Sequence, residues 1–124
     1  MSDKTNAEKL QIMDDYVVWV ISTNDEEAAL LDPLPSGVEV VDEPSDDISA
    51  VVLFVENREY LADQLDEILP QLGSTPVIWI GYPKGNRTDI NRDSIWELVG
   101  EYGWGLVSNV SLDEDWSAVR LKQA

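Results

Sequence analysis

The sequence predicts a single α/β domain built on a mostly parallel β-sheet of about six strands. Three runs, at 16–21, 50–55 and 77–80, contain no charge and do not alternate between apolar and polar residues. Strands of this kind are buried on both faces, as the central strands of a parallel sheet are. Between the second and third runs, apolar side chains recur at helical spacing, at Leu61, Leu65, Ile68 and Leu72. A strand, a helix and a second strand in this order predict two parallel strands joined by a crossover.

The first half of the chain adds one strand and two short helical segments to this unit. Residues 1–15 are expected to be a polar, partly ordered N-terminal arm, in which Ala7–Ile12 forms one helical turn against the domain of residues 16–124. Asn24 is a suitable N-cap for a short helix through Leu31. Val38–Val41 is a short outer strand. Its direction stays open, because the link of about eight residues that follows it reaches roughly 26 Å when extended.

The second half is expected to contain two helices and a terminal hairpin. Asn57 is the expected N-cap of a helix through Leu69. A second helix begins at Asn91 or at Ser94, and the pair Ser94 and Glu97 favours the later start because it has the spacing of a capping box. Its expected apolar face is Ile95, Leu98, Val99 and Tyr102. The stretches 106–112 and 116–122 are strands, and the short turn between them makes them antiparallel.

The five tryptophans are expected to have two kinds of role. Four of them lie in strands, on a helix or at a strand entrance, which predicts core or near-core positions: Trp19, Trp79, Trp96 and Trp104. Trp116 follows three consecutive acidic residues at the hairpin turn, and it is therefore the one candidate for contact with a ligand.

Composition excludes several functions. The 124 residues include 25 acidic and 8 basic ones, and the net charge of −17 disfavours binding to nucleic acid or to an anionic membrane. Cysteine and histidine are absent, which removes thiol nucleophiles, histidine bases and the usual zinc ligands. No apolar run approaches the ~20 residues of a membrane span, and the N-terminus has no signal pattern, so we expect a cytoplasmic protein. The acidity itself fits a solvated surface, a high-salt habitat or a basic protein partner.

The order of elements resembles the Rossmann-like sheet of the S-adenosylmethionine-dependent methyltransferases. The resemblance is carried by the runs at 50–55 and 77–80, the helix between them and the terminal hairpin. A closer resemblance, to a small bacterial domain-of-unknown-function family with a methyltransferase-like fold, covers nearly the whole chain through Pro83-Lys84 and Asp113-Glu114-x-Trp116-Ser117. These likenesses imply a three-layer sheet with strand order 2-1-3-4-6-5, and they imply no particular reaction.

The loop after the first strand departs from the methyltransferase pattern. Nucleotide-type cofactors usually need glycines there, so that the backbone approaches the ligand and a helix N-terminus points at it. This loop is Ser22-Thr23-Asn24-Asp25, which has no glycine, and three acidic residues at 25–27 would repel a phosphate. We therefore expect no cofactor bound in the usual way.

A binding site in such a sheet is expected outside the carboxyl ends of the parallel strands. Three of the eight basic residues, Arg58, Lys84 and Arg87, fall at this edge, which predicts a local site for a carboxylate or phosphate. Tyr82 or Trp116 would form a flat wall, while Asp89 and Asp113 complete the candidate ligand-binding set. The alternative is that these bases only neutralise the acidic residues Glu56, Asp89 and Asp113.

The first functional hypothesis is a non-catalytic module that binds a protein partner or a small anionic metabolite, because no nucleophile and base can be paired in the sequence. The second is a methyltransferase-like enzyme, with Lys84 and Asp113 as its acid and base. Asp113, Glu114 and Asp115 have the oxygen ligands of a divalent-metal site, but three acidic residues in a hairpin turn are more often solvated, so we expect no metal.

Overall fold

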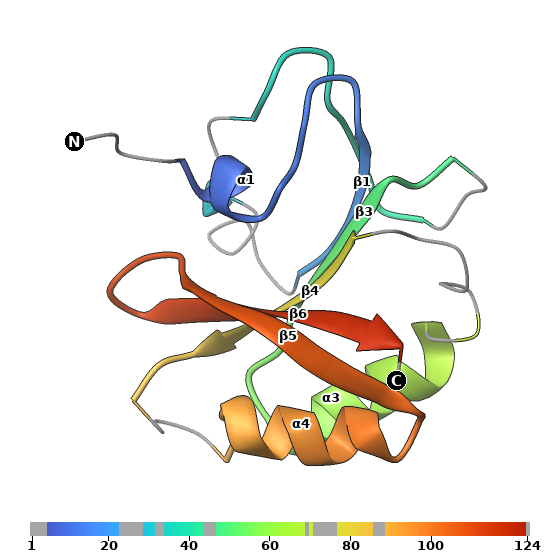
Figure 1. The fold of residues 1–124 in the computed structure, drawn as a ribbon, viewed down its shortest axis with the longest axis vertical. Helices are drawn as coiled ribbons and strands as arrows, with labels where there is room; N and C mark the ends of the chain where they lie inside the picture. Colours follow the sequence, from blue (N-terminus) through green and yellow to red (C-terminus); the bar gives the residue numbers. More distant parts are fainter. Residues whose placement is uncertain are drawn as a thin grey trace.

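The computed structural model describes residues 5–22, 29–31, 34–43, 47–68, 70, 77–85 and 89–123. Its elements, drawn in Figure 1, are α1 (Asn6–Lys9), β1 (Val17–Ile21), β2 (Glu39–Val41), β3 (Ala50–Phe54), α3 (Arg58–Ile68), β4 (Val77–Pro83), α4 (Arg92–Gly100), β5 (Trp104–Ser111) and β6 (Trp116–Gln123). Leu72, Arg87 and all but the last three residues of the helix predicted from Asn24 to Leu31 lie outside the described residues.

The six strands form one mixed sheet in the order β2-β1-β3-β4-β6-β5, which confirms the predicted order. β2, β1, β3 and β4 are parallel, and β6 is antiparallel to both β4 and β5. Val18 is in register with Val40 of β2 and with Ala50 of β3, which settles the open direction of β2 as parallel. One irregularity interrupts the edge strand β5 between Leu106 and Ser108, where Val107 is 52% exposed.

Both faces of the central strands are buried, as their uncharged sequences predict. All five residues of β3 are buried, and the first six of β4 are too. α3 and α4 lie together on one face of the sheet and α1 lies on the other, so the domain has three layers (Figure 1). One core cluster joins Leu53 and Ile80 to α3 and α4, whereas the other joins Phe54 and Trp79 to the segment around α1.

α3 follows the predicted apolar stripe. Leu61, Leu65 and Ile68 are buried, and the side chain of Asn57 accepts a hydrogen bond from the Tyr60 backbone N–H at 2.7 Å, as an N-cap does. None of the helices in the described part of the chain combines the length and the apolar character that a membrane crossing requires.

Two side chains of the α4 region, Trp96 and Tyr102, are more exposed than the sequence predicted. Ile95 and Val99 are buried as predicted, but Trp96 is 59% exposed, so the prediction of a near-core position was wrong. Consecutive helical residues point about 100° apart, and Ile95 takes the direction that faces the sheet. Tyr102 is also partly exposed, at 37%, and its hydroxyl donates to Asp66 of α3 at 2.5 Å instead of entering the core.

The segment around α1 is fastened to the sheet. Thr5 and Glu8 form a capping box at the start of α1, and Ala7, Leu10 and Ile12 are buried. The indole N–H of Trp79, a residue that is 1% exposed, donates to the Leu10 carbonyl at 2.8 Å. This segment therefore closes the second face of the sheet.

Gly81 lies opposite Phe54 in the sheet, and a Cβ at this position would lie 2.7 Å from the nearest atom of the Phe54 ring. Because Phe54 is fully buried, we expect Gly81→Ala to lower the free energy of unfolding by about 1–3 kcal/mol through overpacking. Urea denaturation measures this change. Gly100→Ala is the control, because a Cβ there meets nothing within 4 Å and alanine should stabilise α4 by up to about 1 kcal/mol. Equal effects of the two substitutions would contradict this account.

The hydrogen bond from Tyr102 to the Asp66 carboxylate, together with partial burial and neighbouring carboxylates, raises the pKa of Tyr102 from 10.0 to about 12. The fold therefore favours the protonated phenol, and this contribution to stability is complete below pH 10.0 and is lost as the pH rises through about 12. Asp66→Asn should move the pKa of Tyr102 back toward 10.0, which phenolate absorbance would detect, with Tyr102→Phe identifying its signal. An unchanged titration in Asp66→Asn would refute the assigned cause.

Candidate functional site

The end of β4 and the β5–β6 turn lie at the same edge of the sheet. Pro83 is paired with Trp116, and the backbone N–H of Lys84 donates to the Asp115 carbonyl at 2.8 Å. Because β1, β3 and β4 are parallel, their carboxyl ends share this edge. The sheet thus brings Lys84 to the Asp113 turn, as the predicted topology requires.

The Lys84 side chain continues toward the hairpin. Its ammonium group donates to the Ser111 hydroxyl at 2.5 Å, and that hydroxyl lies 3.3 Å from the Asp113 carbonyl, to which it donates. Lys84 has no carboxylate partner among the described residues, so neutralisation by Asp113 does not explain its position.

A second lysine reaches the same serine. The ammonium group of Lys9, at the end of α1, donates to the backbone carbonyl of Ser111 at 2.9 Å. Its contacts with the described residues likewise include no carboxylate. Two positive charges therefore meet at one residue of a protein whose net charge is −17.

Asp113 shapes the turn. One oxygen of its carboxylate accepts hydrogen bonds from the backbone N–H groups of Asp115 and Trp116, both at 2.7 Å. Such a side-chain-to-backbone turn is a common use of aspartate. Within the described ranges, no three acidic side chains are grouped as a metal site would need.

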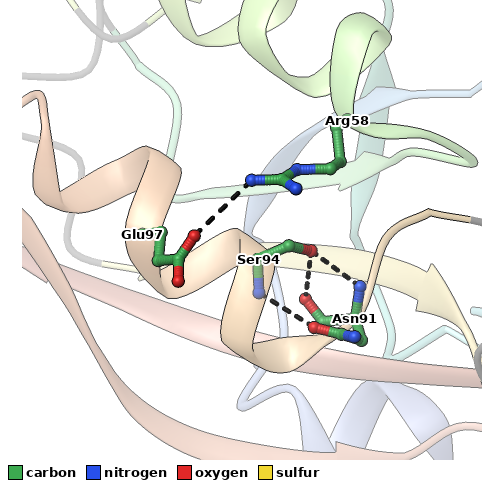
Figure 2. Close-up of polar contacts among 4 residues, drawn as sticks. All are labelled: Arg58, Asn91, Ser94 and Glu97. Atoms are coloured by element: carbon green, nitrogen blue, oxygen red, sulfur yellow. Dashed lines mark hydrogen bonds and ion pairs between the residues drawn. The ribbon is translucent and has the colours of Figure 1, made fainter.

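Arg58 belongs to a separate polar group between α3 and α4, shown in Figure 2, and the Asp89 side chain contacts the Arg58 backbone. The Asp89 carboxylate accepts from the Arg58 backbone N–H at 3.0 Å, so it stabilises the start of α3. The Arg58 guanidinium lies 3.5 Å from the Glu97 carboxylate, and both side chains are substantially exposed, which limits this ion pair to about 0–1 kcal/mol. The Arg58 guanidinium is thus paired with Glu97, whereas Asp89, which the neutralisation alternative named, contacts the Arg58 backbone N–H.

Figure 2 also settles the start of α4. Asn91 is the N-cap: its side chain accepts from the Ser94 N–H at 2.9 Å, while the Ser94 hydroxyl accepts from the Asn91 N–H at 2.8 Å. The start at Asn91 is therefore correct, and the capping box of Ser94 with Glu97 was wrong. Ser94 is the third residue of α4 and forms the capping box with Asn91. The Glu97 side chain is therefore not part of the box and pairs with Arg58.

The two candidate aromatic residues lie on opposite faces of the sheet. Tyr82 is 6% exposed in the core beneath α3 and α4, and its hydroxyl accepts from the Asn109 side chain at 3.2 Å. Trp116 is half-buried on the other face, with its ring edge-on to Phe54 at a centroid distance of 5.6 Å. They do not form one wall together.

The structure thus divides the predicted site residues. Lys84, Asp113 and Trp116 lie at the hairpin, whereas Arg58 and Asp89 lie between the helices, and no hydrogen bond or ion pair in the described part joins the two groups. Two surface hollows, of about 650 and 410 Å³, lie beside α1 instead. The larger one extends to Leu34 and Pro35, and the smaller one to Tyr16 and Val77. Their lining residues include Glu8, Ile12 and Met13 in both cases.

Sequence reasoning missed Lys9 and Ser111. They are separated by 102 positions, so no local spacing could bring them together. The one indication in the sequence was the helical turn that we expected at Ala7–Ile12 against the domain. Leu10 and Ile12 are buried there, which fixes the position of the neighbouring Lys9.

Solved structures with a similar fold include methyltransferases. The B. subtilis M1A22 tRNA methyltransferase TrmK matches with a TM-score of 0.60 and 12% identity, over 100% of this chain and 67% of that one. Magnesium protoporphyrin IX methyltransferase from Synechocystis, with bound S-adenosylmethionine, matches with a TM-score of 0.55 and 7% identity, over 88% and 60%. A protein of the NADB-Rossmann superfamily from Streptococcus agalactiae matches with a TM-score of 0.53 and 13% identity, over 89% and 52%.

At these identities the likeness concerns the fold alone, and this chain spans about half of the Streptococcus agalactiae protein. The fold is therefore Rossmann-like and resembles that of the methyltransferases. A comparison with the curated protein sequences gave no match. The family described as a protein of unknown function, DUF3052, matches residues 7–124, and the chain therefore belongs to the DUF3052 family.

Proposed function

We propose that this domain is a non-catalytic binding module that holds a small anion, a carboxylate or a phosphate, at the carboxyl edge of its sheet. The observation that carries the proposal is the position of Lys84. Its backbone is fixed to Asp115, and its ammonium group rests on the neutral hydroxyl of Ser111. An anion would replace this neutral acceptor by a charged one, which adds a charge–charge attraction to the hydrogen bond that the ammonium group already makes.

The expected affinity is modest. A charge pair at 4 Å in water contributes about 1 kcal/mol, whereas a dissociation constant of 1 mM requires about 4 kcal/mol. The carboxylates of Asp113, Glu114 and Asp115 oppose an anion, although that of Asp113 faces two backbone N–H groups. An inorganic ion should therefore bind in the millimolar range or more weakly.

A methyltransferase-like enzyme is the second candidate, favoured by the fold that the chain shares with an S-adenosylmethionine-bound structure. Two features of this chain count against it. The loop from Ser22 to Asp25 has no glycine, and the Asp113 carboxylate, the expected partner of Lys84 in acid–base chemistry, is held by the turn. The alternative predicts saturable binding of S-adenosylmethionine, which calorimetry would detect.

The proposal is tested by titrating the protein with inorganic phosphate and with acetate at constant ionic strength. Backbone amide NMR shifts of residues 111–116 should move with a single saturable curve. Lys84→Gln should weaken binding about fivefold, because it removes a charge contact of about 1 kcal/mol. Lys122→Gln is the matched control, because Lys122 is an exposed lysine of β6 whose partner in the sheet is Gly105. If the two variants lose affinity equally, or if the shifts do not saturate in the wild type, the proposal fails.

A further inference from the structure

We infer that Lys9 is the second cation of this site, and that the site suits a phosphate group better than a single carboxylate. The inference rests on the proposed function, because it assigns a further residue and a ligand class to the same edge of the sheet. Its basis is that Lys9 and Lys84 both contact Ser111, one through the carbonyl at 2.9 Å and the other through the hydroxyl at 2.5 Å.

Lys9 is held in position by the residues that follow it. The carbonyl of Leu10 accepts the buried Trp79 indole N–H at 2.8 Å, and the side chain of Gln11 accepts from Arg120 of β6 at 2.5 Å. Gln11, two residues after Lys9, adopts a φ of 62°, a left-handed conformation that ends the helical path of α1. A charge on a fixed segment loses less conformational entropy on binding than one on a mobile arm.

Stabilisation of its own helix does not explain the position of Lys9. A basic residue in the last turn usually interacts with the carbonyl end of its helix. α1 has only 4 residues, and the Lys9 ammonium group instead contacts a carbonyl 102 positions away in β5. Lys9 therefore carries its charge to the hairpin.

The class of ligand follows from the charges. Two ammonium groups that contact the same residue repel each other, and a compact dianion offsets this repulsion better than a monoanion does. A phosphate group carries nearly two charges over three oxygens, so each lysine can donate to a separate oxygen. A carboxylate offers a single charge to both lysines.

The test compares four substitutions in the full chain, each titrated with inorganic phosphate and with acetate, followed by NMR at constant ionic strength. Lys9→Gln removes the charge but keeps a side-chain N–H group, Lys9→Arg keeps the charge, and Lys84→Gln and Lys122→Gln are as above. Thermal unfolding of each variant shows whether α1 stays in place.

We expect wild type and Lys9→Arg to bind phosphate at least fivefold more tightly than acetate, whereas Lys9→Gln should lose this preference through a phosphate affinity about fivefold lower. If Lys9→Gln behaves like Lys122→Gln while Lys84→Gln weakens both anions, the inference about Lys9 is refuted and the proposed anion site stands. If neither Lys9→Gln nor Lys84→Gln differs from Lys122→Gln, both are refuted. Equal binding of phosphate and acetate by the wild type refutes the ligand class.

Discussion

The burial of β3 on both faces is the constraint on which the rest of the structure depends. A strand of five uncharged residues between two parallel neighbours needs cover above and below the sheet. α3 and α4 supply it on one side, through a regular apolar stripe. On the other side the described cover includes a single helical turn, the residues after it, Leu31 and Leu112. Each large apolar side chain that is removed from water there contributes about 1.5–3 kcal/mol. The N-terminal segment is therefore a structural part of the domain.

The parallel strands and the cover of the second face also explain why two lysines contact Ser111 at one edge of the sheet. Parallel strands deliver their carboxyl ends together, and the terminal hairpin places its turn beside the end of β4. The segment that covers the second face ends close enough to that turn for Lys9 to reach Ser111. The candidate site thus combines three stretches that are distant in sequence, around Lys9, Lys84 and Ser111. The fold that it shares with methyltransferases places ligands at the same edge of the sheet.

The sequence predicted the parts of the structure that periodicity determines. Uncharged runs and a stripe with helical spacing are local patterns, and the strand order followed from the likeness that they carry. The sequence did not determine the partner of a side chain where two residues at suitable spacing could both be that partner. Ser94 has suitable spacing for Asn91 as well as Glu97, and tertiary contact with Arg58 accounts for Glu97. Asp89 precedes one helix in the sequence but contacts the start of the other. Lys9 shows the limit most clearly, because its partner depends on the assembled sheet.

The irregularity in β5 has a consequence for behaviour at high concentration. β5 is an outer strand of eight residues, and an unbroken outer strand of this length offers its free N–H and C=O groups as a template for another chain. The shift between Leu106 and Ser108 interrupts that ladder near its middle, and Val107 lies in the interruption. A bulge of this kind twists the edge and prevents continuous pairing. We therefore expect the β5 edge to be a poorer template for the addition of another chain, even where salt screens the repulsion between the negative charges of the protein.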